Sequence, residues 1–257
     1  MSLKAAALIL AQALASASLS VQAGLDCDVR TGPNTAALVE LYTSEGCSSC
    51  PPADQQLSRL RQSLGSSAQV VPLSLHVGYW DSLGWTDRFA QDRFARRQAW
   101  LVRVHGHRSV YTPQFFVAGA ELQPRQTTLA DMARRLNATQ ATAAIRLRSA
   151  LTADDILTLD ANATAHAGND TTALYLAIAE NGLQSRVQTG ENRGALLAHD
   201  HVVREWLGPF PLRDGATQVR REVRLPSDWR RQRMELVAFV QNEWTGAVLQ
   251  AVACPGS

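Results

Sequence analysis

Two cysteines three positions apart, Cys47 and Cys50, are the residues of this sequence best suited to chemistry. Two thiols at this spacing can form a disulfide with each other, so one can attack a substrate disulfide and the other can resolve the mixed disulfide. The attacking species is the thiolate, which a helix N-terminus stabilises through unpaired backbone N–H groups and a partial positive charge. A dithiol at the start of a helix would therefore suit thiol–disulfide exchange.

The residues on either side of the cysteine pair predict a strand that leads into a helix. Residues 38–42 are apolar and rich in β-formers, and a Thr-Ser-Glu-Gly turn follows at 43–46. The two prolines at 51–52 are tolerated only in a first helical turn. Leucines then recur at the spacing of one buried helical face, at Leu57, Leu60 and Leu64. The dithiol is therefore expected at a strand-to-helix junction.

The segments that follow predict an α/β domain over residues 24–142. Residues 69–77 are typical of a strand buried on both faces, which would complete a right-handed strand–helix–strand unit. Residues 87–104 show the pattern of an amphipathic helix. Two short strands and a further helix are expected after it, at 114–118, 121–123 and 128–136.

From residue 143 the hydrophobic pattern changes to a period of two. Seven short strands separated by polar turns are expected, at 145–148, 157–163, 172–180, 202–207, 217–225, 235–242 and 247–253. A hairpin turn at 242–246 would pair the last two. This spacing is typical of an antiparallel sandwich, so we predict an all-β, sandwich-like domain over residues 143–257.

Three runs of residues are specific enough to compare with a known family. They are residues 40–54, the run His-Val-Gly-Tyr-Trp-Asp from His76, and the run Tyr-Thr-Pro-Gln from Tyr111. Together they resemble a bacterial family of secreted thioredoxin-like proteins known as a domain of unknown function, number 1223. The resemblance implies a thioredoxin-like fold for the first domain, with Cys47 as the nucleophile and Cys50 as the resolving thiol. We also expect Cys47, the outer cysteine, to be the more exposed.

Glu40 lies in the middle of the first expected strand, where a carboxylate is costly unless it is paired or protonated. Thioredoxins carry an acid beneath their dithiol at a similar distance before the first cysteine. The resemblance therefore implies that Glu40 has a raised pKa and exchanges protons with Cys50. A salt bridge on a solvated strand face is the alternative, and the sequence does not decide between them.

The resemblance also implies a substrate-binding wall beside the dithiol. Thr112 and Pro113 match the cis-proline loop that faces the dithiol in thioredoxin-like proteins, although a turn proline opening an edge strand is an alternative. The end of the second strand, whose carboxyl end would lie beside the dithiol, is followed by a cluster of His76, Tyr79, Trp80, Asp81 and Trp85. We assign these residues to the pocket wall, with ordinary core packing as the alternative for the aromatic ones.

Residues 180–200 are expected to form a long loop, and loops of this length are more often functional than idle. Its candidate contact residues are Glu191, Asn192, Arg193, His199, Asp200 and, just beyond it, His201. The two histidines alternate, so they would share one face of a strand and could bind copper or zinc together with the cysteines. Surface polar histidines are the ordinary alternative, and we assign no metal ligand.

The first 23 residues are expected to be a removed signal peptide. Lys4 supplies a small positive region, residues 5–15 an apolar one, and residues 21–23 fit a cleavage site. An uncleaved anchor is the alternative.

Export, to the periplasm or beyond, would place the cysteines in an oxidising compartment. Joining Cys27 to Cys254 would leave the close pair free to cycle, whereas two unpaired thiols at flexible ends remain the alternative.

Composition and charge narrow the functional classes. The formal net charge of +2 is too small to indicate binding to nucleic acid or to a membrane surface. The sequence therefore predicts an exported thiol–disulfide oxidoreductase that acts on protein or small thiol substrates, and it calls for no cofactor. A metallochaperone with the same thiols and a non-catalytic binding module with a structural disulfide are the alternatives. The sequence does not indicate an oligomeric state.

Overall fold

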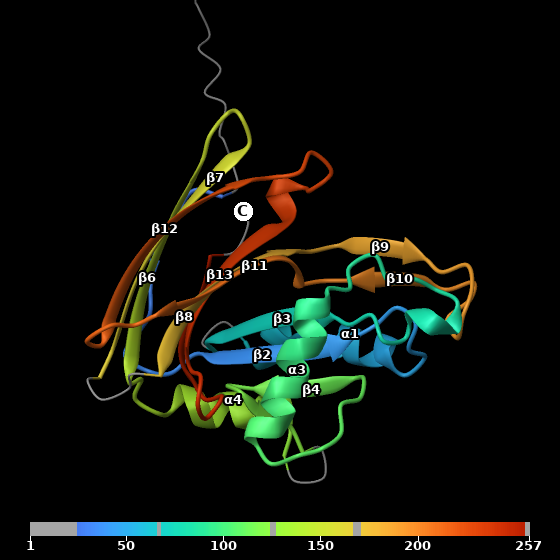
Figure 1. The fold of residues 1–257 in the computed structure, drawn as a ribbon, viewed down its shortest axis with the longest axis horizontal. Coiled ribbons are helices and arrows are strands. Elements are labelled where there is room, and N and C mark those ends of the chain that lie inside the picture. Colours follow the sequence, from blue (N-terminus) through green and yellow to red (C-terminus); the bar gives the residue numbers. More distant parts are fainter. Residues whose placement is uncertain (1–24, 66–67, 124–126, 167–170, 255–257) are drawn as a thin grey trace, which may run out of the picture.

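The structure is a computed structural model that describes residues 25–65, 68–123, 127–166 and 171–254 (Figure 1). The expected signal peptide, residues 1–23, lies outside the described residues. Within them, no helix is long and apolar enough to cross a membrane.

A large mixed sheet runs through the molecule. Its eight strands are β2 (Ala37–Thr43), β3 (Val70–His76), β4 (Gln114–Val117), β5 (Ala120–Glu121), β8 (Thr172–Glu180), β11 (Val202–Pro211), β13 (Met234–Asn242) and β14 (Val248–Cys254). They lie in the order β14-β13-β8-β11-β3-β2-β4-β5. Strand β3 pairs in parallel with both β2 and β11, and the remaining pairs in this sheet are antiparallel.

Two smaller sets of strands accompany this sheet. A four-stranded antiparallel sheet contains, in spatial order, β1 (Cys27–Arg30), β6 (Ala143–Leu151), β7 (Ile156–Ala165) and β12 (Ala216–Arg224). Strands β9 (Leu183–Arg186) and β10 (Leu196–His199) form a separate antiparallel hairpin. Figure 1 shows the four-stranded sheet at the left and the β9–β10 hairpin at the right of the molecule.

Helices cover the β2 half of the large sheet. They are α1 (Cys50–Ser58), α2 (Leu60–Leu64), α3 (Asp92–Val104) and α4 (Leu129–Asn137), with short 3-10 turns at η1 (Asp81–Leu83) and η2 (Arg231–Arg233). Because side chains alternate along a strand, β2 serves two cores. Val39 and Leu41 pack with α1 and α4, whereas Leu38 and Tyr42 pack with α3.

The other half of the large sheet is covered by the four-stranded sheet. Leu174 and Leu176 of β8 pack into a core with β6 and β7, while Tyr175 and Ala177 on the opposite face share the α3 core. The α3 core therefore extends continuously across strands from both halves of the sequence. This continuity makes the two halves interdependent for burial of apolar surface.

The expected fold class, a thioredoxin-like α/β domain followed by a separate sandwich, is wrong. The structure is mostly β, and strands from both halves of the chain belong to one sheet, with Val202 of β11 opposite Ser74 of β3. The periodicity of a segment predicts a strand but not the strand with which it pairs. An exposed edge of β3 would leave backbone N–H and C=O groups without partners, and at Ser74 the N–H donates to His201 O, next to the start of β11, at 2.8 Å. The seven strands expected after residue 143 are nevertheless present, and the last two pair as predicted.

The loop expected over residues 180–200 is also wrong, because most of it belongs to the β9–β10 hairpin. Alternating burial of Leu183 and Ser185 on one strand, and of Leu197 and His199 on the other, gives the hairpin a buried face. Strand β10 lies against α1. The hairpin therefore reaches the helix that carries the second cysteine of the close pair.

Candidate functional site

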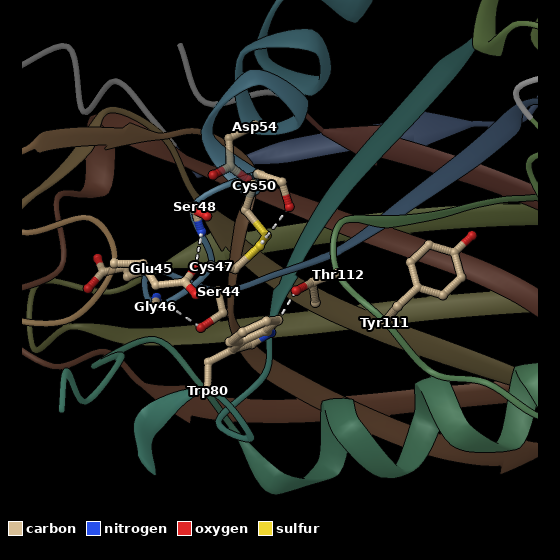
Figure 2. Close-up of a disulfide and its surroundings, with 12 residues drawn as sticks. Ser44, Glu45, Gly46, Cys47, Ser48, Cys50, Asp54, Trp80, Tyr111 and Thr112 are labelled. Atoms are coloured by element: carbon tan, nitrogen blue, oxygen red, sulfur yellow. Dashed lines mark hydrogen bonds between the residues drawn. A yellow bond between two sulfur atoms is a disulfide. The ribbon is translucent and has the colours of Figure 1, made fainter. Parts of the chain in front are cut away.

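Cys47 and Cys50 form a disulfide at the junction between β2 and α1 (Figure 2). Their Cα atoms are 5.5 Å apart. The backbone N–H of Cys47 donates to Ser44 O, and that of Cys50 donates to Cys47 O, at 3.2 Å each. Cys50 is the first residue of α1, so its side chain lies at a helix N-terminus. The strand-to-helix junction expected around the dithiol is therefore present.

Both cysteines of this pair are buried. Cys47 is only 1% exposed and Cys50 is fully buried, whereas Ser48 and Ser49 between them are exposed. Cys47, expected to be the more exposed of the two, is covered by neighbouring segments almost as completely as Cys50. In this oxidised state an attacking thiolate has to displace some of those neighbours.

The tip of the β9–β10 hairpin is one of the covering segments. Asn192 Nδ2 donates to the backbone oxygens of Glu45 and Cys47, both at 2.9 Å. A carboxylate oxygen of Glu191 accepts a hydrogen bond of 3.0 Å from the backbone N–H of Ser48. Hydrogen bonds from Ser48 also lower the pKa of Glu191. Two residues singled out in the expected loop, Glu191 and Asn192, therefore hold the turn that carries the cysteines.

Arg193, the third residue singled out at this tip, is exposed. No hydrogen bond or ion pair of its side chain is found within the part of the chain that the structure describes. The structure therefore does not bring the Arg193 guanidinium into the site.

Trp80 and Thr112 border the disulfide on another side (Figure 2). Trp80 Nε1 donates to Thr112 Oγ1 at 2.7 Å, and the peptide bond between Thr112 and Pro113 is cis. A Cβ added at Gly46 would lie 3.0 Å from Trp80 Cβ, so Trp80 packs directly on the turn before Cys47. Tyr79 is more exposed and tilts against Trp80. Of the residues assigned to the pocket wall, Tyr79, Trp80 and the Thr112–Pro113 loop thus lie along one border, although their role in binding stays a prediction.

Glu40 does not lie beside the dithiol. Its carboxylate accepts two hydrogen bonds from the buried Arg97 of α3, at 2.6 Å from Nε and 3.0 Å from Nη2. Arg97 belongs to the helix that covers one face of β2, whereas Cys50 belongs to α1 on the opposite face. The structure thus contains a salt bridge, buried rather than solvated, and offers no contact for proton exchange between Glu40 and Cys50.

A cluster of ionisable residues lies beside the cysteine-bearing turn, and sequence reasoning singled out its histidine, His199, but missed its two acidic residues. We define it as Glu45, Asp54 and His199, all of which are buried. His199 Nε2 is 3.3 Å from a Glu45 oxygen, and His199 Nδ1 is 3.6 Å from an Asp54 oxygen. Glu45 precedes Cys47 by two residues and Asp54 follows Cys50 by four, so the cluster has one acidic residue on each side of the cysteine pair in the sequence.

The charges in this cluster depend on one another. Burial lowers the pKa of His199, but the adjacent carboxylates of Asp54 and Glu45 outweigh it and raise the pKa to about 9. Burial likewise raises the pKa of Glu45, and the adjacent His199 leads the effects that bring it below its usual value. At neutral pH the cluster therefore holds an imidazolium ion beside a carboxylate.

A second acid–histidine pair extends this network. His76 Nδ1 lies 2.7 Å from Asp87 Oδ2, and the ring centroids of His76 and His199 are 4.9 Å apart. Asp87 also accepts from the backbone N–H of Glu45 at 2.9 Å, while Trp85 Nε1 donates to the Glu45 carboxylate at 2.7 Å. The sequence signal for this network was the acidic residue on each side of the cysteine motif, but the histidine partners come from distant strands.

The shared face expected for the two alternating histidines is wrong. The backbone turns at His201, where φ is 57°, and His201 Nδ1 lies 3.0 Å from Glu235 Oε2, away from the cluster that contains His199. Asp200, between them, accepts from the backbone N–H of Gly182 at 2.7 Å. Among the residues whose positions are described, no group of three or more His, Cys, Asp or Glu is arranged to hold a metal ion.

Cys27 and Cys254 form the second disulfide, the pairing that was expected. Their Cα atoms are 6.4 Å apart, and the bond joins β1 of the four-stranded sheet to β14 of the large sheet. This disulfide is remote in sequence from the cysteine motif and ties the two sheets together.

A family model described as "Protein of unknown function (DUF1223)" matches residues 38–241. The chain belongs to the DUF1223 family. The matched region contains Cys47, Cys50, the β9–β10 hairpin and all the residues of the buried cluster. It does not contain Cys27 or Cys254. A search of curated proteins finds no match for this DUF1223 chain.

Two solved structures are similar to this DUF1223 protein. Protein AGR_C_4864 from Agrobacterium tumefaciens is 25% identical, with a TM-score of 0.62, and the alignment covers 88% of this chain and 97% of that one. HBP35 of Porphyromonas gingivalis is 17% identical, with a TM-score of 0.65, over 87% of this chain and 76% of that one. The second likeness concerns the fold alone.

Proposed function

We propose that this DUF1223 protein is an exported thiol–disulfide redox protein whose dithiol is formed by Cys47 and Cys50. The observation that carries the proposal is the disulfide between these residues at the N-terminus of α1. When this disulfide is reduced, the partial positive charge of the helix N-terminus favours a thiolate. A thiolate with a second thiol within bonding reach is the functional unit of a dithiol exchange reaction.

The exchange has two steps. The Cys47 thiolate attacks one sulfur of a substrate disulfide, forming a mixed disulfide and releasing a substrate thiolate. The Cys50 thiolate then attacks Cys47, which closes the Cys47–Cys50 disulfide and releases the second substrate thiolate. Two electrons pass from the protein to the substrate, and the protons of the two thiols go to the two thiolates released. The same steps in reverse oxidise a substrate dithiol.

Burial of both cysteines limits which substrates can react. Asn192 and Glu191 hold the turn from one side, and Trp80 packs on it from another. A protein substrate has to displace the hairpin tip, whereas a small thiol needs a narrower opening. The substrate class is therefore an exported protein thiol or disulfide, or a small thiol, that gains access when this cover opens.

The same burial favours a second candidate function, a non-catalytic binding module whose Cys47–Cys50 disulfide is structural. With 1% and 0% of the two residues exposed, a static bond would be well protected from solvent thiols. The two functions differ in the reduction potential of this bond, because structural disulfides in exported proteins resist reduction.

A redox titration of the intact protein distinguishes them. The protein is equilibrated in thiol–disulfide buffers, alkylated, and mapped by mass spectrometry so that each cysteine pair is followed separately. We expect Cys47–Cys50 to titrate between about −120 and −270 mV. A value below about −300 mV would reject the redox function and leave the structural one.

The matched control is the double variant Cys47→Ser, Cys50→Ser. It should retain only the titration of Cys27–Cys254. Turnover of a fluorescent peptide disulfide by the parent protein, and its absence in this variant, would then assign the exchange to the close pair.

A further inference from the structure

A cavity of about 850 Å³ lies between β8, β11 and the start of β9, outside the dithiol site. Four arginines line it, namely Arg88, Arg204, Arg230 and Arg233, and its apolar surface is supplied by Phe89 and Leu183. Cavities of this volume are typical of small-molecule sites, in which a few polar groups fix the orientation of a ligand.

The charges around this arginine cavity do not balance. The carboxylates that line it are Glu180 and Asp228, against four guanidinium groups. Glu180 is fully buried and binds both Arg204 and Arg230, with an oxygen 3.2 Å from Arg230 Nε. The Glu180 carboxylate therefore pairs with two of the four arginines. The residues that line the cavity keep a net positive charge.

Arg88 and Arg233 are the two arginines of the cavity whose guanidinium N–H donors are not engaged by a carboxylate among the described residues. Arg88 Nη2 donates to the backbone oxygen of Gln184 at 2.8 Å, and its guanidinium lies 4.6 Å from the centre of the Phe89 ring. Across the described ranges neither Arg88 nor Arg233 forms an ion pair with a carboxylate. Each therefore presents N–H donors that no acidic side chain occupies.

The neighbouring positive charges also affect the pKa of Arg204. Burial lowers the pKa of Arg204, and the nearby charges of Arg88 and Arg230 lower it further against the opposing effect of Glu180. A negative group that entered the cavity would relieve this repulsion.

We propose that the arginine cavity binds a small organic anion through a phosphate or carboxylate group. The planar fork of a guanidinium matches either group with two parallel hydrogen bonds, which distinguishes arginine from lysine at such sites. Arg88 and Arg233 supply the forks, and Phe89 and Leu183 contact the apolar part of the ligand. This site shares no residue with the dithiol and does not depend on its function.

Calorimetric titration at constant ionic strength tests the site, with pyrophosphate and citrate as the two probes. We expect saturable one-to-one binding, and the probe that binds more tightly identifies phosphate or carboxylate as the preferred group. Arg88→Gln and Arg233→Gln should each weaken binding at least about tenfold, because each variant loses the charge-assisted hydrogen bonds of one guanidinium fork. Both side chains are at the surface, so the variants should melt at the temperature of the parent protein.

The control is Arg96→Gln, which removes the same charge from an exposed position on α3 that does not line the cavity. Binding should be unchanged in this variant. The proposal is overturned if neither probe binds saturably at millimolar concentrations, or if Arg96→Gln weakens binding as much as the two cavity variants do.

Discussion

Buried charges in this protein occur in complementary sets, each holding a residue from a distant part of the chain. Arg97 neutralises Glu40 beneath α3, and His199 lies between Glu45 and Asp54 beside the cysteine-bearing turn. Removing one member of a buried pair leaves an uncompensated charge and typically costs about 3 to 5 kcal/mol. These residues therefore matter for stability whether or not they take part in exchange.

The charge of His199 makes stability depend on pH. Its pKa is raised from 6.5 to about 9 in the folded protein, so the stability it contributes is fully present below about pH 6.5 and is lost as pH rises through 9. The free energy of unfolding should fall by roughly 3 kcal/mol over this range, from the shift in pKa. In His199→Gln this part of the decline should disappear.

Urea unfolding at stepped pH measures this effect. His166→Gln, which changes an exposed histidine, is the control and should keep the decline of the parent protein. An identical pH dependence in His199→Gln and the parent would show that His199 is not held as an imidazolium ion.

At the scale of elements, the β9–β10 hairpin connects the arginine cavity with the dithiol. Leu183 at the start of β9 lines the cavity, and the hairpin tip carries Glu191 and Asn192 to the turn between β2 and α1. The tip makes side-chain hydrogen bonds to the backbone of that turn. Such contacts can open without loss of a hydrophobic core.

Shortening Asn192 should speed reduction of the Cys47–Cys50 disulfide. Asn192→Ala removes two hydrogen bonds to the turn, each worth about 0.5 to 1.5 kcal/mol, so opening of the cover should become about tenfold more frequent. The rate is measured by reduction with glutathione, timed alkylation and mass spectrometry of the two cysteines.

Arg193→Ala is the matched control, because it truncates a neighbouring exposed side chain at the same tip. Its reduction rate should equal that of the parent protein. Equal rates in Asn192→Ala and Arg193→Ala would mean that the hairpin tip does not limit access to the disulfide.

At the scale of the whole molecule, two sheets are joined by packing and by one covalent bond. The Cys27–Cys254 disulfide connects strands 227 residues apart in the sequence. A crosslink that closes so long a loop restricts the unfolded chain strongly, by about 5 kcal/mol in the chain-entropy account.

The double variant Cys27→Ala, Cys254→Ala should therefore lose about 5 kcal/mol of unfolding free energy, measured by urea unfolding. The disulfide between Cys47 and Cys50 closes a much shorter loop. The variant Cys47→Ala, Cys50→Ala should therefore lose only about 2 kcal/mol of unfolding free energy on the same account. A larger loss from the short loop than from the long one would contradict this entropic explanation.

The sequence by itself determined the local features of this protein. The apolar run at 38–42, the turn, the dithiol and the two prolines predicted a strand entering a helix, and β2 and α1 form there. Period-two alternation predicted the strands after residue 143. These signals are readable because side-chain alternation, turn chemistry and proline geometry act between residues that are neighbours in the chain.

Only the tertiary structure decided which of these elements meet. The pairing of β11 with β3, the choice of Arg97 as the partner of Glu40, and the burial of Cys47 all depend on contacts between distant segments. Periodicity describes the faces of a segment but not the segment that covers each face. For this reason the motif was visible in the sequence, whereas the cover over the disulfide and the charges around it were not.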